Sequence, residues 1–588
     1  MWFVGLDQTQ DDKHKRAGTA GSFHWSWLYL LTSIFFISAS KTSAETSDRH
    51  SLPILDQKEI ELLAKDRQWL KLIHFEPSVF LPPSGQIDSP DFYLANTGKE
   101  NAEDELREFV RRLTYETQLG IQQISTLPEE NLIRCRFPAR VRWLRKQRPS
   151  LPIPEIRCPR LEDFRIKRGG QSVSLVFSSY YVNNPSSSFG HTLLRINRKA
   201  GADGRRFELL DYGFNFAAQA TSTNPLVYSV KGLFGGFDGV FSSLPYYFKV
   251  REYNQAEARD LWEYELNLSA DEVSMLVDHL WEVGPQKIDY WYLTENCAYF
   301  MLTLLEAGAP QWNLDRAMKT YVIPSDTIRL VAEQPGLVRR ISFRPSIRRE
   351  FLTRFQLLND EQKRATIEGA KALGDSDRAQ TYSFGSDPMI YDALLDYIDM
   401  TYAVEIQMEN TNAKHMRDRL LSRRSRLPST PELNVPVPES ERPDLGHSSR
   451  RTGLGLRNKT DTLSSQAKNY LDISYRFAHH DLLDPIVGYP RDARIQFFDF
   501  SGYLDQSQLH VEDWTMIGIQ SLNPVSVWDK NMSWEFNMGL EDDEFFRLRL
   551  GGGYSARFDQ LLFYGGIQAL AGTQLGISTG QTTSREAQ

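Results

Sequence analysis

The spacing of apolar residues changes several times along the chain, and this restricts the fold more than any other feature. Residues 56–147 carry apolar side chains at helical spacing, as in DQKEIELLAKDRQWLKLIHF. From about residue 170 the apolar residues alternate, helical spacing returns over 350–424, and alternation resumes beyond 457. A period of 3.6 predicts amphipathic helices, and a period of two predicts half-buried strands. The sequence therefore predicts a multidomain α+β protein.

A chain of 588 residues is expected to form several domains, because single cores rarely exceed about 250–300 residues. Within the central region, QSVSLVFSSYYV, GHTLLRINR, RFELLDYGFNFAA and YYFKVREY are predicted as strands, and SADEVSMLVDHLWEV as a helix. The predicted segments are a signal peptide (1–44), a helical N-terminal domain (45–147), an α+β domain (148–330), a helical connector (331–424), a disordered linker rich in proline, serine and charge (425–456) and a β-rich domain (457–588).

The N-terminus has the pattern of a secretory signal. Positive residues at 13–16 precede a mostly apolar run from Trp25 to Ala39, and KTSAE offers small residues for cleavage after Ala44. An uncleaved anchor is the alternative. No cysteine follows the run, which argues against a lipoprotein anchor, and no later stretch has the 18 apolar residues of a membrane helix. We therefore expect an exported protein.

The charge balance argues against nucleic acid as the main partner. The formal net charge is -8 and the sequence pI is about 5.9. Binding to phosphates needs a basic surface, which this balance does not suggest.

Export determines how the three cysteines are interpreted. In an oxidising compartment, Cys135 and Cys158 are expected to form a disulfide that closes a loop of roughly 23 residues and stabilises the fold by about 3 kcal/mol. Cys297 is then the odd cysteine, a free thiol.

Cys297 lies at the start of a predicted helix in WYLTENCAYFMLTLLEAGAP. Thr294 is the expected N-cap, and Gly308 with Pro310 ends the helix. The unpaired N–H groups of the first turn and the helix dipole favour an anion, so we expect a lowered thiol pKa and a nucleophilic sulfur. The same N–H groups offer an oxyanion site. A buried structural cysteine is the alternative.

A thiolate nucleophile needs a base, and the histidines differ in their settings. His191 opens a strand behind small residues, so its ring is accessible from a cleft. His279 has the spacing of a residue on a helix surface or core edge. His479 and His480 adjoin two aspartates, but neighbours on a strand point to opposite faces and chelate poorly. We expect His191 as the base, and neither a metal nor a cofactor.

Several motifs resemble a known enzyme family. GHTLLRI followed by ENCAYF resembles the His…Asn-Cys-x-x-Phe pattern of permuted NlpC-type enzymes related to lecithin:retinol acyltransferase. SSSFGHTLLRI, LLDYGFNFAA, KGLFGGFDGVFSSLPYYFKVREYN and LWEYELNL resemble the N-terminal periplasmic domain of Lnb, the bacterial lipoprotein intramolecular transacylase family. The resemblance covers about residues 165–320. It implies a permuted papain-like core in the periplasm or cell envelope, in which Cys297 attacks an acyl carbonyl with His191 as base.

A third polar residue is expected to orient the imidazole, as in other triads. Asp211 and Asn215 are four residues apart on the following predicted strand, so their side chains point to the same face of the sheet. A symmetric hairpin brings Asp211 closer to His191, and a shifted register brings Asn215; the NFAA that matches the family favours Asn215. The loop KGLFGGFDG lacks the Lys-Ser/Thr step of a phosphate-binding loop, so we expect its backbone to approach a substrate.

The resemblance stops where Lnb proteins continue into membrane helices, because this chain continues into a helical segment and a β-rich tail. The first functional hypothesis is a thiol acyltransferase or hydrolase on acyl esters of lipoproteins or lipids, with membrane contact. The second is a cell-wall peptidase or amidase with the same dyad, and the third is a non-enzymatic envelope scaffold. Aromatic and glycine-rich surroundings such as FGGFDGVFSSLPYYF favour the acyl substrate.

The tail contains six predicted strands, among them MSWEFNMGL and LLFYGGIQALAG. In the first of these, Trp534, Phe536 and Met538 face one side and polar residues face the other. Both a water-soluble sheet and an outer-membrane barrel have this pattern. The aromatic content favours a barrel-like domain associated with the outer membrane.

Overall fold

The computed structural model describes most of the chain from residue 55 to residue 574. The predicted signal peptide, residues 1–44, lies outside the described residues. Within 55–574 the description leaves out residues 77–81, 120, 125, 181–188, 202–204, 220–230, 233–234, 315–320, 376–377, 379–381, 409–410, 461–466, 506–507, 542–544 and 559–560.

The N-terminal part is helical, as its apolar spacing predicts. At its centre the ring of Trp69 stacks on that of Trp143, with centroids 5.0 Å apart. Asp66 accepts hydrogen bonds from the backbone N–H of Trp69 and from the indole N–H of Trp143, so one carboxylate caps one helix and anchors another. The elements are α1 (Gln57–Leu63), α2 (Arg67–Leu72), β1 (Phe75–Glu76), β2 (Ser84–Gly85), α3 (Ala102–Gln118), α4 (Ile121–Ile124), η1 (Glu129–Asn131), α5 (Ile133–Arg136) and α6 (Pro138–Gln147).

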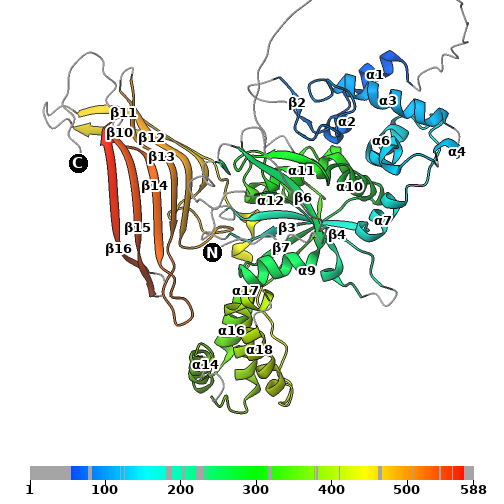
Figure 1. The fold of residues 1–588 in the computed structure, drawn as a ribbon. Coiled ribbons are helices and arrows are strands. Elements are labelled where there is room, and N and C mark those ends of the chain that lie inside the picture. Colours follow the sequence, from blue (N-terminus) through cyan, green and yellow to red (C-terminus); the bar gives the residue numbers. More distant parts are fainter. Residues whose placement is uncertain are drawn as a thin grey trace, which may run out of the picture. The chain divides into compact units, whose positions relative to one another are not determined.

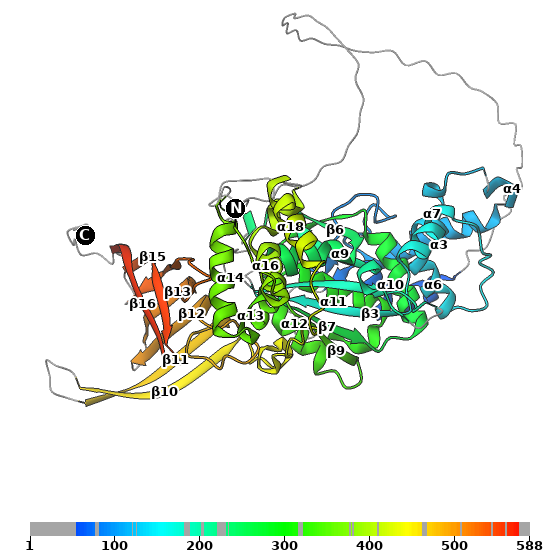
Figure 2. The ribbon, with the colours of Figure 1, turned by 90° about the horizontal axis from the view of Figure 1, so that it is seen from below.

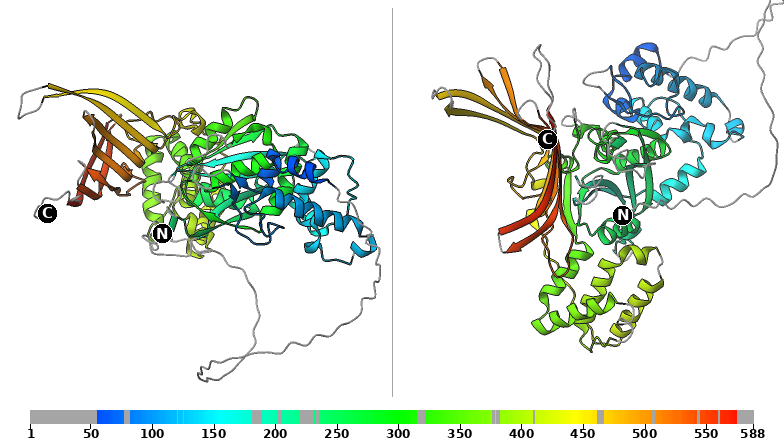
Figure 3. Two further views of the ribbon diagram at one scale, coloured as in Figure 1. Left: turned by 90° about the horizontal axis from the view of Figure 1, so that it is seen from above. Right: turned by 60° about the vertical axis from the view of Figure 1, so that its left-hand side comes forward.

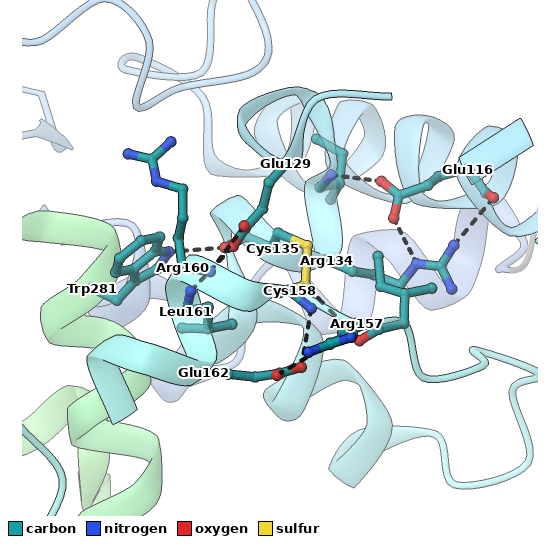
Figure 4. The surroundings of a disulfide bond; sticks show 12 residues. Glu116, Glu129, Arg134, Cys135, Arg157, Cys158, Arg160, Leu161, Glu162 and Trp281 are labelled. Atoms are coloured by element: carbon teal, nitrogen blue, oxygen red, sulfur yellow. Dashed lines mark hydrogen bonds and ion pairs between the residues drawn. A yellow bond between two sulfur atoms is a disulfide. The ribbon is translucent and has the colours of Figure 1, made fainter. Parts of the chain in front are cut away.

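A disulfide joins this helical part to the central domain. Cys135 lies in α5, and Cys158 is the N-cap of α7 (Pro159–Arg168), the helix before the central sheet. The indole N–H of Trp281 donates to the carbonyl oxygen of Cys135 at 2.8 Å, so the bridge also rests on a helix of the central domain (Figure 4). The linkage restricts how far α7 can separate from α5.

A seven-stranded antiparallel sheet forms the central domain, in the order β8-β6-β5-β4-β3-β7-β9 (Figure 1). Every residue of β3 is buried, as expected for a strand in the middle of a covered sheet. The strands are β3 (Ser172–Ser178), β4 (His191–Asn197), β5 (Tyr212–Ala218), β6 (Phe237–Pro245), β7 (Leu261–Leu266), β8 (Lys287–Tyr290) and β9 (Val338–Arg344). The last strand shows that the sheet extends beyond the predicted boundary at residue 330.

Three helices pack with this sheet: α10 (Ala270–Val283), α11 (Cys297–Gly308) and α12 (Pro324–Ala332). Figure 1 shows α10 and α11 side by side, and α11 contacts β4 and β5. A Cβ added at Gly308 would lie 3.2 Å from a backbone oxygen of α10, so this glycine permits the close approach of the two helices. The contacts set the start of α11 against the start of β4.

The segment YYFKVREY is helical, and its prediction as a strand is wrong. It forms α9 (Tyr246–Lys249) and η4 (Val250–Ala256), a π-helical segment, whereas the strand β6 lies just before it. Tyr246, Val250 and Tyr253 are spaced by four and three residues and share a buried cluster with side chains of the sheet. Helical spacing was present, but the aromatic and β-branched composition is also typical of a strand.

The predicted helical connector is helical, and its helices gather into one group in Figure 2. Leu394 and Ile398 lie at its core. Among the helices that the structure describes, none has both the length and the hydropathy required to span a membrane. The helices are α13 (Ile347–Leu357), α14 (Asp360–Leu373), α16 (Pro388–Thr401), α17 (Ala403–Gln407) and α18 (Thr411–Arg424).

Residues 425–456 are not a disordered linker, because their second half is fixed against the central domain. The hydroxyl of Tyr264 donates to Asp444 at 2.6 Å, and Ser449 donates to Asp326 of α12. The polar composition of this segment predicted a solvated linker, but its polar side chains form hydrogen bonds to the central domain instead. The segment contains η7 (Glu439–Glu441), η8 (Pro443–Leu445) and the start of β10 (Arg451–Thr460), a strand absent from the prediction.

The C-terminal part is a second seven-stranded sheet in which consecutive strands pair antiparallel (Figure 3). Strands β10 and β16 form its two edges and do not pair with each other over the described residues, so the predicted barrel is not closed. The strands that follow β10 are β11 (Ala467–His480), β12 (Ala493–Asp505), β13 (Gln508–Ser521), β14 (Ser533–Glu541), β15 (Phe545–Phe558) and β16 (Leu561–Gln574).

In this sheet many polar side chains are buried and many apolar side chains are exposed, the reverse of the usual arrangement in water. Ser533, Glu535 and Asn537 of β14 are buried, and Glu535 accepts a hydrogen bond from Arg494 at 3.0 Å. Apolar side chains on the strands are instead exposed, including Leu454, Leu456, Leu550, Tyr554, Phe558, Phe563, Ile567 and Leu570. A sheet with one face in water usually buries its apolar side chains, and this sheet exposes many of them instead.

The two sheets share a small hydrophobic cluster close to the start of β4. Phe189, Tyr321 and Ile323 of the central domain pack with Ala478, Ile495 and Phe497 of β11 and β12. Phe189 precedes His191 by two residues, so the C-terminal sheet supports the backbone that leads into this histidine.

Candidate active site

Cys297 is the first residue of α11, and the residue is only 4% exposed. Asn296 is the N-cap, not Thr294: its Oδ1 accepts from the N–H groups of Ala298 and Tyr299 at 3.1 and 3.2 Å. The Asn296 amide also donates to the carbonyl oxygen of Val322 at 2.7 Å. An asparagine amide has two N–H donors besides its acceptor oxygen, and here they bond to the carbonyl oxygens of both Tyr292 and Val322, whereas a threonine hydroxyl has only one donor.

His191 is the first residue of β4, and its Nε2 is hydrogen-bonded to Oδ1 of Asn215 on β5. The amide oxygen only accepts, so Nε2 carries the proton and Nδ1 has the free lone pair. The registered pairs of β4 and β5 place Leu194 opposite Phe214, which is the shifted register. This register brings Asn215 to the histidine.

The sulfur of Cys297 lies at the same end of β4. The backbone N–H of Thr192, the residue after His191, hydrogen-bonds to this sulfur. Tyr253 of η4 is a neighbour of both residues. Its ring centroid is 5.5 Å from that of His191, and its hydroxyl is close enough to interact electrostatically with Cys297. The fold therefore brings a thiol, an imidazole and an amide together from α11, β4 and β5.

Burial controls the protonation of both reactive groups. It raises the pKa of Cys297 to about 11, although the N–H groups of Thr192 and Ala298 and the charge of Arg259 act in the opposite direction. Burial also lowers the pKa of His191 to about 3, although the hydrogen bond that the ring donates to Asn215 acts in the opposite direction. The resting pair is a neutral thiol and a neutral imidazole. The expectation of a lowered thiol pKa was wrong, because desolvation outweighs the helix N-terminus.

Asp211 does not reach the imidazole. Its Oδ1 accepts from the backbone N–H of Arg198 at 2.9 Å, and its other oxygen lies 3.7 Å from the guanidinium groups of Arg195 and Arg206. The carboxylate stabilises the turn before β5 and balances nearby arginines.

Residues 162–334, from α7 to just beyond α12, match the family described as the Lnb N-terminal periplasmic domain. This region belongs to that family. Residues 61–147 and 440–583 match two domains of unknown function, DUF7843 and DUF7840. No curated protein and no solved structure matches the chain. The family places the Lnb domain of this chain among proteins of the cell envelope.

The glycine-rich loop of the Lnb domain lies beside the segment that leads into α11. The carbonyl oxygen of Gly232 accepts from the backbone N–H of Tyr292 at 3.1 Å. Gly235 has a φ of +82°, and a Cβ there would lie 2.7 Å from the ring of Trp291. Only glycine fits this conformation and this contact. The approach of the loop to a substrate remains a prediction.

The other histidines lie away from the thiol. His279 is fully buried rather than at a helix surface, because the N-terminal helical part covers α10 and brings His74 within 3.1 Å of its ring nitrogen. His479 packs against Tyr180 and Phe189. His480, the next residue of β11, also packs against Tyr489, as His479 does.

The sequence did not single out Tyr253 or Arg259. Arg259 is buried, donates to the carbonyl oxygen of Ser178 at 2.8 Å, and lies 5.3 Å from the ring centroid of Tyr253. Its charge lowers the pKa of both Cys297 and His191. Tyr253 falls within KVREYN, so the motif was recognised, but its prediction as a strand obscured which side chains turn inward.

Proposed function

We propose that this protein is an exported cysteine-dependent acyltransferase or hydrolase that acts on acyl esters of lipoproteins or lipids. The observation that carries the proposal is the joint placement of Cys297, His191 and Asn215 within an Lnb N-terminal periplasmic domain. Cys297 is the nucleophile, His191 the base and Asn215 the residue that orients the ring.

The first step begins from neutral groups. As the sulfur of Cys297 attacks the acyl carbonyl carbon, Nδ1 of His191 accepts the thiol proton. The hydrogen bond from Nε2 to Asn215 keeps the lone pair on Nδ1 and stabilises the imidazolium that forms. The imidazolium then protonates the leaving alkoxide oxygen, which gives an alcohol and a thioester on Cys297. An amine or water attacks the thioester in the second step and restores the thiol.

The start of α11 offers a donor for the oxyanion of this reaction. The side chain of Asn296 already accepts from Ala298 and Tyr299, so the N–H of Cys297 is the donor of the first turn that the cap leaves available. A preorganised N–H in a buried site stabilises a developing oxyanion strongly. The N-cap thus leaves the backbone N–H of Cys297 as the donor that would bind the oxyanion of the substrate.

The choice of an acyl substrate rests on the domain family and on the surroundings of the site. Trp291, six residues before Cys297, packs on the glycine-rich loop, and Phe248, five residues before Tyr253, is exposed on α9. Such side chains suit an acyl chain better than a charged peptide. The same dyad would also cleave a cell-wall peptide, which makes peptidase or amidase activity the rival reading.

We further propose that the protein contacts a membrane through the exposed apolar face of the C-terminal sheet. Leu456 is 89% exposed and Ile567 is 85% exposed, whereas polar residues of the same sheet are buried. Contact with lipid would remove this apolar surface from water and bring the Lnb domain to its substrate. Location at the outer membrane is part of this proposal.

A direct comparison of substrates tests the function. The purified chain would be mixed with a diacylated lipopeptide, with phospholipid vesicles and with muropeptides, and the products would be measured by mass spectrometry. We expect an acyl adduct on Cys297 and release of the deacylated product. Cleaved muropeptides without acyl transfer would support the peptidase, and turnover of no substrate by folded protein would support a binding scaffold.

A further inference from the structure

Three side chains of the C-terminal region converge outside the Lnb domain. The Nε2 of His447 lies 3.2 Å from the Nδ1 of His480 and 3.7 Å from the Oδ2 of Asp484. The Nδ1 of His480 lies 3.9 Å from the same oxygen. Ligand atoms around one zinc ion, each bound at about 2.0–2.2 Å, are separated by about 3.3–3.6 Å in a tetrahedral site. The three atoms therefore need only small shifts to share an ion.

The two imidazoles are held in the orientation that a metal requires. The Nδ1 of His447 is hydrogen-bonded to the carbonyl oxygen of Ser448 at 2.7 Å, so Nδ1 carries the proton and Nε2 offers its lone pair to the cluster. The ring of Tyr489 stacks on those of His447 and His480, with centroids 4.1 and 4.6 Å away. These contacts fix both rings without help from the ligand.

The carboxylate of Asp484 is buried and supported in turn. Its Oδ2 accepts from the backbone N–H of Asp481 at 2.9 Å and forms an ion pair with Arg476 at 2.6 Å, and its Oδ1 accepts from Arg451 at 3.1 Å. Ligating carboxylates commonly have such outer partners. The guanidinium groups of Arg476 and Arg451 oppose a cation, and the carboxylates of Asp484 and Asp481 offset these two positive charges.

We propose that His447, His480 and Asp484 bind one divalent transition-metal ion, with zinc as the best fit. Two imidazoles and one carboxylate favour zinc over magnesium or calcium, which prefer oxygen ligands. Three protein ligands leave a fourth position for water. The adjacent His479 packs against Tyr180, Phe189 and Tyr489 and does not belong to the cluster of ligand atoms.

The position of this site indicates a structural role. His447 belongs to a segment fixed to the Lnb domain through Asp444 and Ser449, which bond to Tyr264 and Asp326. His480 and Asp484 lie at and just beyond the end of β11. A bound ion fastens the C-terminal sheet to this segment and thereby to the Lnb domain.

Metal titration of the full exported chain tests the site. The parent protein carries Cys297→Ala, so that no free thiol competes, and has no polyhistidine tag. We expect one equivalent of zinc to bind in competition with a chromophoric chelator, cobalt to give a visible ligand-field spectrum, and zinc to raise the unfolding temperature. Replacement His447→Ala should weaken zinc binding more than about tenfold and remove the cobalt spectrum.

The exposed His415 on α18 provides the matched control, and His415→Ala should bind zinc as the parent does. His447 is only partly buried, so its replacement spares the core, and far-UV circular dichroism verifies the fold. Substitutions of the buried His480 and Asp484 serve as supporting variants. Substoichiometric zinc binding by the folded parent, or unchanged affinity in His447→Ala, overturns the proposal.

Discussion

Asn215 accepts a hydrogen bond from the Nε2 of His191 across the neighbouring strands β5 and β4. The bond selects the imidazole tautomer whose free lone pair is on Nδ1. The residue that follows the histidine, Thr192, directs its backbone N–H at the sulfur of Cys297. One strand end thus orients an imidazole and holds a thiol, and the predictions below follow from this arrangement.

Loss of either member of the dyad should remove turnover. Cys297→Ala and His191→Ala are each expected to reduce acyl-ester cleavage by about 10³-fold or more, and the double variant should lose no more, because the two groups act in one step. Steady-state kinetics on the preferred substrate would measure this. Full activity in His191→Ala, or an acyl adduct in Cys297→Ala, would show that the site is misassigned.

The orienting residue should matter less than the base. Asn215→Ala is expected to lower kcat by about ten- to a hundredfold with little change in KM, because the ring loses its hydrogen bond but keeps its place. Asp211→Asn is the matched comparison, since Asp211 lies on the same stretch but contacts Arg198 instead. Equal losses of kcat in both variants would contradict the assignment.

The thiol should be a poor nucleophile in the free enzyme at neutral pH. With its pKa raised to about 11 by burial, about one sulfur in ten thousand is ionised at pH 7. Alkylation of Cys297 by iodoacetamide should therefore rise about tenfold per pH unit between pH 7 and pH 10. The site is followed by peptide mass, with Cys297→Ala as the blank. A rate that levels off below pH 7 would indicate a preformed ion pair.

The disulfide should contribute to stability, and the third cysteine should stay free. Replacing Cys135 and Cys158 by alanine is expected to lower the free energy of unfolding by about 3 kcal/mol. Urea unfolding would measure the change, with Cys297→Ala as the control that preserves the bridge. Non-reducing peptide maps of the exported protein should show Cys297 unbridged; a bridge from Cys297 to either partner would refute the catalytic role.

The apolar face of the C-terminal sheet should carry membrane binding. Leu456→Asp combined with Ile567→Asp is expected to reduce co-flotation with phospholipid vesicles at least tenfold, because charges in an apolar contact are costly. Leu357→Asp, at an exposed leucine of α13, is the control. Wild-type protein that stays away from vesicles and is fully soluble without detergent would exclude the contact.

The sequence alone determined the local features that depend on neighbours along the chain. Helical spacing before residue 147 and between 350 and 424 was sufficient to predict helices there, because one buried face per helix repeats every three to four residues. The motifs around His191 and Cys297 likewise predicted two residues that the structure brings to the start of β4, and the odd cysteine count indicated which thiol is free.

Only the tertiary structure decided questions of distance and environment. The register of β4 and β5 selected Asn215 over Asp211, because register depends on how a whole sheet packs. Burial reversed the expected direction of the thiol pKa, since desolvation comes from distant segments that cover the site. His447 meets His480 from 33 positions away in the chain, and local patterns contain no signal for such a meeting.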